Sequence, residues 1–185
     1  RDVFAVLRYT PNLIDLNVTT VLCSIHQNRE QPMTMRGYKL QKLALTFLWK
    51  DPDDVTDQTT YLHLISDIKL FSSSLTCLSM NFIDLNVAST DELPFNGLKL
   101  QHQLLKSMIT LDQFHLYAKT RQHSINVDGV LSTFTDRFWL DRRWFVAMHG
   151  TYLYPLPFHF HELHGFIDFD RVQSTDTALL ADMTT

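Results

Sequence analysis

The chain has 185 residues, of which 45 % are hydrophobic and 19 % are charged, and its net charge is −4. This length and balance predict one globular domain and exclude an intrinsically disordered segment. No run reaches the roughly 18 apolar residues of a membrane span and no basic stripe marks a nucleic-acid surface, so we expect neither partner. The first residue is Arg1, which suggests a fragment of a longer protein. The two cysteines form no disulfide framework, so we expect an intracellular protein, cytoplasmic or nuclear.

An apolar pattern of the form L-x-x-L-x-L occurs four times. Its members are Leu13, Leu16 and Val18; Leu40, Leu43 and Leu45; Leu75, Leu78 and Met80; and Leu111, Phe114 and Leu116. The last two apolar residues of each unit alternate with polar ones, as in a strand with one buried face. The unit therefore predicts four short parallel strands, with Leu16, Leu43, Leu78 and Phe114 in one buried column.

Helical patterns precede two of these strands. Tyr61, Leu64, Ile65 and Ile68 form one helical stripe within residues 60–71. Residues 97–108 carry a similar stripe of Leu98, Gln101, Leu104, Leu105 and Met108, with one polar interruption. Residues 3–7 suggest a truncated first helix, whereas the connection near Pro32 has room for only one helical turn.

Residues 134–169 hold half of the aromatic side chains. Residues 144–149 and 151–154 flank Gly150, which predicts two strands around a tight turn. Pro155 and Pro157 are expected to end the second strand or to confine it to a sheet edge. A third short strand is predicted at Phe166–Phe169.

We therefore predict an α/β fold: a leucine-rich-repeat-like solenoid of helix–strand units on a parallel sheet, capped by an aromatic-rich C-terminal β segment. The prediction is a single domain over residues 1–170, with repeats over 1–128 and a cap over 129–170. Residues 171–185 are rich in Ser, Thr and Asp and are expected to fray.

The repeats resemble those of F-box/leucine-rich-repeat proteins, through the turn Tyr9-Thr10-Pro11-Asn12-Leu13. The C-terminal block is similar to that of a large F-box-like group found in rotifers. It carries Phe138-Trp139-Leu140, then Trp144-Phe145-Val146, then Tyr152-Leu153-Tyr154-Pro155-Leu156-Pro157. The resemblance implies the substrate-recognition part of a ubiquitin-ligase adaptor, with its F-box helices upstream of Arg1. The asparagine of the standard repeat is replaced by Val21, Leu48, Ile83 and Lys119, so no asparagine ladder is expected.

No motif predicts catalysis or a cofactor. The chain has no nucleophile elbow and no phosphate-binding glycine loop. The run from His159 to His164 lacks the H-E-x-x-H spacing of zinc proteases. We therefore predict a protein that is not an enzyme. The alternative from another class is a metal-dependent hydrolase that uses the histidines His149, His159, His161 and His164.

The residues between the buried strand positions point to the opposite face of the sheet. On that face we predict a surface that binds a protein partner without a chemical step. Its candidate residues are Asp15, Asn17, Lys42, Thr46, Ser79, Asn81, Gln113, His115 and Tyr117. Trp139 and Trp144 are interpreted as core residues. A merely solvated sheet face, in a structural fragment without a partner, is the other interpretation.

Overall fold

The computed structural model describes residues 9–22, 39–49, 58–85, 96–121, 125–157 and 173–176. Its strands are β1 (Asp15–Leu22), β2 (Lys42–Trp49), β3 (Cys77–Leu85), β4 (Gln113–Thr120), β5 (Phe145–His149), β6 (Tyr152–Leu156) and β7 (Gln173–Ser174). Its helices are α2 (Gln58–Lys69), α3 (Gly97–Gln103), α4 (Val127–Ser132) and α5 (Arg137–Asp141), with a 3₁₀ turn η1 (Leu105–Ser107). Within these ranges no helix is long and apolar enough to cross a membrane.

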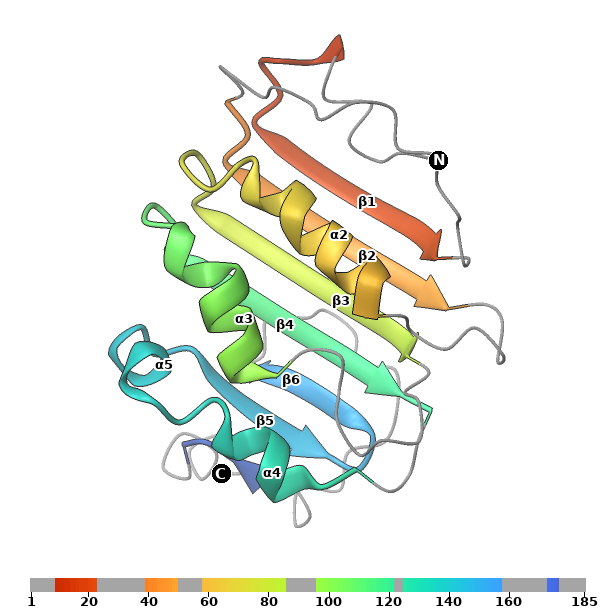
Figure 1. The fold of residues 1–185 in the computed structure, drawn as a ribbon, viewed down its shortest axis with the longest axis vertical. Helices are drawn as coiled ribbons and strands as arrows, with labels where there is room; N and C mark the ends of the chain where they lie inside the picture. Colours follow the sequence, from red (N-terminus) through yellow and green to blue (C-terminus); the bar gives the residue numbers. More distant parts are fainter. Residues whose placement is uncertain are drawn as a thin grey trace.

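The seven strands form one sheet in the order β1-β2-β3-β4-β6-β5-β7. β1 to β4 are parallel neighbours, whereas β6, β5 and β7 join antiparallel. Figure 1 shows the described helices lying over one face of this sheet. Along the chain, α2 lies between β2 and β3, and α3 lies between β3 and β4, as in crossover connections between parallel strands.

The predicted column of apolar side chains is present. Leu16 pairs in register with Leu43, Leu43 with Leu78, and Leu78 with Phe114. The last three are buried, and Leu16 is half-buried against the same core. Alternation of apolar and polar residues fixes this register, because a slip by one residue would turn every apolar side chain to the other face.

The predicted solenoid of helix–strand units is wrong. Only part of the sheet is parallel, and the described ranges hold four α-helices against seven strands. The C-terminal β segment is not a separate cap either, because β6 hydrogen-bonds to β4 and continues the same sheet. The physical reason is that β4 would otherwise present an unpaired edge, and an antiparallel hairpin satisfies its main-chain groups directly. The result is a mixed α/β domain, mostly sheet.

Three local predictions also need comment. The hairpin around Gly150 is confirmed, with β5 and β6 paired and Gly150 at a φ of 56°. The helix over 60–71 is confirmed as α2, with Tyr61, Ile65 and Ile68 buried. The second helix is shorter than predicted, because Leu104 leaves the helical region at φ −130° and ψ −66° and α3 ends there. The buried face of α3 is Gly97, Leu100 and Gln101, so Leu98 faces outward.

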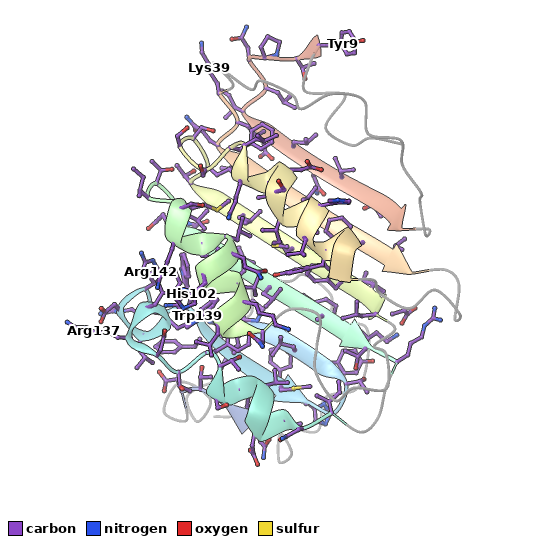
Figure 2. All side chains as sticks on the ribbon, in the orientation of Figure 1. Tyr9, Lys39, His102, Arg137, Trp139 and Arg142 are labelled. Atoms are coloured by element: carbon purple, nitrogen blue, oxygen red, sulfur yellow. The ribbon has the colours of Figure 1, made fainter. Side chains whose placement is uncertain are left out.

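Aromatic side chains fill the core between the helices and the C-terminal strands. Trp139 is fully buried and meets Phe134 edge-to-face at 4.8 Å between ring centroids. Trp144 lies 5.5 Å from Phe114 and 6.1 Å from Trp139. Figure 2 shows Trp139 among these layers. The interpretation of both tryptophans as core residues is therefore confirmed.

Several predictions lie outside the described residues: the first helix at 3–7, the turn near Pro32, Cys23, and the strand at Phe166–Phe169. Within the tail expected to fray, Gln173 and Ser174 form β7 against β5.

Candidate functional site

The nine predicted binding residues lie on one face of the sheet. Their strand neighbours Leu43, Leu45, Leu78 and Met80 belong to the core beneath the helices, so the alternate positions face the other way. The pairing arranges this outer face in three rows. The rows are Asp15, Lys42, Cys77 and Gln113; Asn17, Ala44, Ser79 and His115; and Thr19, Thr46, Asn81 and Tyr117. We call these twelve residues the outer face.

Exposure changes across the outer face. Asp15, Asn17, Lys42 and Gln113 are exposed, whereas the three residues that β3 contributes, Cys77, Ser79 and Asn81, are half-buried. The Asn81 side-chain amide donates to the Thr46 hydroxyl at 3.1 Å, which links two strands. The Asn81 carbonyl oxygen is buried and has no hydrogen-bond partner within the part of the chain that the structure describes.

Ionisation on the outer face favours neutral side chains. Burial raises the pKa of the Tyr117 phenol to about 12, with smaller contributions from Tyr152 and Asp84. Burial also raises the pKa of the Cys77 thiol, while Lys42 opposes the shift and Asp15 adds to it. A raised thiol pKa keeps the weakly nucleophilic protonated form at neutral pH, which argues against Cys77 as a nucleophile.

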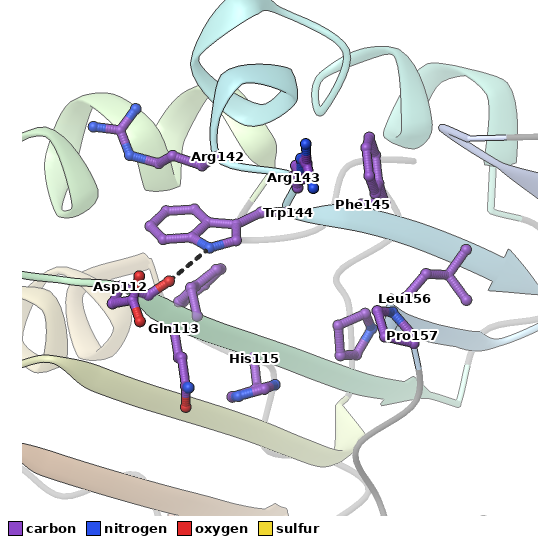
Figure 3. A pocket seen from close by; sticks show the side chains of 11 residues that line it. Asp112, Gln113, His115, Arg142, Arg143, Trp144, Phe145, Leu156 and Pro157 are labelled. Carbon is purple, nitrogen blue, oxygen red and sulfur yellow. Dashed lines mark hydrogen bonds between the residues drawn. The ribbon is translucent and has the colours of Figure 1, made fainter. Parts of the chain in front are cut away.

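A pocket opens where β4 begins and β6 ends. β4 pairs with β6 at Ala118 with Leu153 and at Lys119 with Tyr152. The start of β4, the turn after α5 and the end of β6 enclose a cavity of about 460 Å³, shown in Figure 3. Its lining residues are Asp112, Gln113, Phe114, His115, Arg142, Arg143, Trp144, Phe145, Pro155, Leu156 and Pro157. We call this cavity the wedge pocket; it shares Gln113 and His115 with the outer face.

Pro155 lies within β6, but the strand ends at Leu156, directly before Pro157, so Pro157 ends the strand as predicted. β6 continues to Leu156 and lies between β4 and β5 in the sheet. The Thr120 N–H donates to the Thr151 carbonyl, so Thr151 and, by alternation, Leu153 and Pro155 of β6 direct their main-chain groups toward β4. Pro155 has no N–H to donate, so the ladder between β6 and β4 lacks one bond at this position.

The rim of the wedge pocket is the turn that ends α5. The Arg143 N–H donates to the Leu140 carbonyl at 3.0 Å, and the Trp144 N–H donates to the Trp139 carbonyl at 3.1 Å. This bond pair, with Trp139 against Trp144, is a Schellman helix end. Its left-handed position is Arg143, at a φ of 55°. Glycine is the usual residue there, and a side chain costs about 1 kcal/mol.

Arg142, Trp144 and Asp112 complete this rim. The Arg142 guanidinium lies 4.0 Å from the centroid of the Phe138 ring and 5.5 Å from that of Trp144. It also donates to the Phe138 carbonyl at 3.3 Å. The Trp144 indole N–H donates to the Asp112 main-chain carbonyl at 3.3 Å, which fixes the indole across the end of β4. The Arg142 guanidinium therefore packs against the Phe138 ring and, at a longer distance, against the Trp144 ring.

The sequence reasoning missed the wedge pocket. Trp144 was placed in the core, and no motif singled out Arg142 or Arg143. The available signal was negative: Arg142 and Arg143 lie in a stretch without glycine, from Val130 to His149, so no residue there marks the end of a helix.

The alternative metal site is only partly described. His149 ends β5 and is half-buried, while His159, His161 and His164 lie outside the described residues. In the ranges that the structure describes, no group of three or more metal-binding side chains gathers. No observation therefore favours the hydrolase over a binding role.

Comparison with known proteins adds no family. No family model matches the chain, and neither a curated protein nor a solved structure is significantly similar to it.

Proposed function

We propose that this domain is a non-catalytic protein-interaction module that presents the outer face to a protein partner. The observation that carries the proposal is the alignment of the nine predicted residues in three cross-strand rows, opposite the helix-covered face. A rigid sheet holds these side chains at fixed spacing, so little conformational entropy is lost when a partner binds.

The chemistry of the outer face favours a protein partner over nucleic acid. The face is mostly uncharged and polar, and the chain as a whole carries a net charge of −4. Tyr117 and His115 lie together at the β4 end, and tyrosine is enriched among residues that dominate binding energy. A phosphate backbone would find only Lys42 as a cation among the three rows.

The narrower form of the proposal is the recognition arm of a ubiquitin-ligase adaptor. It is supported by the resemblance of the C-terminal motif from Phe138 to Pro157 to the F-box-like group. It requires an intracellular location, in the cytoplasm or nucleus. It predicts that the partner becomes ubiquitinated when it is co-expressed with the full reading frame, and that Asn81→Arg abolishes this modification.

Site-specific photo-crosslinking tests the broader proposal. A photo-reactive phenylalanine derivative replaces Tyr117 on the outer face or, as a control, Leu62, which is 43 % exposed on α2. We expect a discrete protein to crosslink from position 117 and not from position 62. Asn81→Arg in the same chain should remove that product. Equal crosslinking from both positions, or none from position 117, would contradict the proposal.

A further inference from the structure

We propose that the wedge pocket binds an acidic peptide segment, with its carboxylate at Arg143 and an apolar neighbour beside Trp144. This inference rests on the proposed interaction function and names the chemistry of its partner. The wedge pocket opens beside Gln113 and His115 of the outer face, so one partner can contact both surfaces.

The outer face and the wedge pocket form one continuous surface, because Gln113 and His115 belong to both. The wedge pocket adjoins the β4 end of the face, and its volume of about 460 Å³ lies within the ligand-site range of about 300–1,000 Å³.

Charge at the rim selects an acidic peptide. The lining contains two arginines, Arg142 and Arg143, against one carboxylate, Asp112. In the described ranges neither arginine forms an ion pair, whereas the nearby Arg137 is paired with Asp141 at 3.2 Å. Guanidinium groups bind carboxylates by two parallel hydrogen bonds. Arg143 moreover occupies the left-handed position that glycine fits better, so the helix end itself does not need an arginine there.

The remaining lining favours peptide over nucleic acid. Trp144, Leu156 and Pro157 offer apolar contact for a side chain next to the carboxylate. Asp112 would repel a phosphate backbone, whereas a single peptide carboxylate can stay on the arginine side. RNA is therefore the competing outcome of the test.

Peptide selection against the intact 185-residue chain tests the proposal. Phage-displayed random dodecapeptides are selected on the immobilised protein, and the most enriched peptide is measured by fluorescence anisotropy. We expect enrichment of Asp or Glu next to an apolar residue. Arg143→Gly should weaken binding about tenfold or more while the urea midpoint stays equal or rises. Arg143→Asn, which also tolerates the left-handed conformation, should weaken binding similarly.

Arg137→Gln is the matched control, because it removes the same charge from an arginine that is 91 % exposed and does not line the wedge pocket. Figure 2 shows Arg137 at the margin of the molecule. The affinity of the Arg137→Gln protein for the selected peptide should stay within about twofold of the wild type. No enriched peptide, enrichment without acidic residues, or unchanged affinity in Arg143→Gly would each overturn the proposal. So would tighter, Arg143-dependent binding of a 20-nucleotide single-stranded RNA.

Failure of this inference is distinguishable from failure of the proposed function. If position 117 still crosslinks a protein, but the acidic peptide neither binds the domain nor competes with that protein, only the wedge pocket assignment fails. If position 117 crosslinks no protein, the outer-face proposal fails whatever the peptide does.

Discussion

Gly97 offers a test in which helix propensity and packing predict opposite signs. It is the first residue of α3, buried against the end of α4. Replacing glycine by alanine within a helix normally stabilises by about 1 kcal/mol. Here a Cβ on Gly97 would lie 2.1 Å from the Thr133 carbonyl oxygen and 2.9 Å from Cγ of Phe134. The obstacle is main chain, which cannot rotate away.

Packing decides the sign. Reaching even the 3.0 Å lower limit of real Cβ contacts requires the Thr133 carbonyl to move by about 0.9 Å. That movement strains the 2.8 Å hydrogen bond from the Gly97 N–H to the Thr133 hydroxyl. Overpacking costs about 1–3 kcal/mol and the lost hydrogen bond about 1 kcal/mol. After the propensity gain, Gly97→Ala should lower the free energy of unfolding by about 2 kcal/mol, and Tm by roughly 4–8 °C.

Urea denaturation followed by tryptophan fluorescence measures this change. Gly129→Ala is the control: its Cβ would meet only the side chain of Asn126, at 2.8 Å. That side chain can rotate, although its cap bond to the Gly129 N–H is then lost. We expect a change within about 1 kcal/mol for Gly129→Ala. A Gly97→Ala protein as stable as the wild type would refute the close α3–α4 contact.

Three further predictions concern capping and ionisation. Asp136→Ala should lower the free energy of unfolding by about 1 kcal/mol, measured by urea denaturation, because the Asp136 carboxylate accepts from the Trp139 N–H at the start of α5. Asp136→Asn should keep most of this stability, because its side-chain oxygen can accept the same bond. Burial raises the pKa values of Tyr117 and Tyr154 to about 12 in the folded protein, above the value of 10.0 expected in the unfolded chain. Their contribution to stability is therefore complete below pH 10, and the urea midpoint should fall as pH rises from about 10 to 12. Iodoacetamide should alkylate Cys77 at pH 8 more slowly than a free thiol, by peptide mass spectrometry, since its pKa is raised; a rate equal to glutathione would contradict this.

The parallel half of the sheet could be predicted because its information is local. Each strand carries its own alternation, and the same spacing in four units aligns Leu16, Leu43, Leu78 and Phe114 without knowledge of the rest. The outer-face rows follow from the same register. The helix stripe of α2 is equally local, which is why its buried residues were identified correctly.

The mixed half could not be predicted in the same way. Both strands of the hairpin around Gly150 are visible in the sequence, but which of them joins β4 is a long-range choice. The sequence reasoning treated the aromatic block as a cover for the last repeat, whereas β6 satisfies the β4 edge by direct pairing. Similarly, the stripe over 97–108 has helical spacing throughout, yet Leu104 ends the helix, and α3 buries Gly97, Leu100 and Gln101 while Leu98 is 47 % exposed.

The position of Pro155 follows from the pairing and from proline chemistry. Continuing the register of Ala118 with Leu153 by two residues places Leu116 opposite Pro155. At such a position both residues would exchange main-chain bonds, and Pro155 has no N–H to donate. The ladder between β4 and β6 therefore lacks one bond there, while Pro155 keeps its register with Val146 of β5. The wedge pocket lies just beyond this position, where the start of β4 and the end of β6 meet the arginines that end α5.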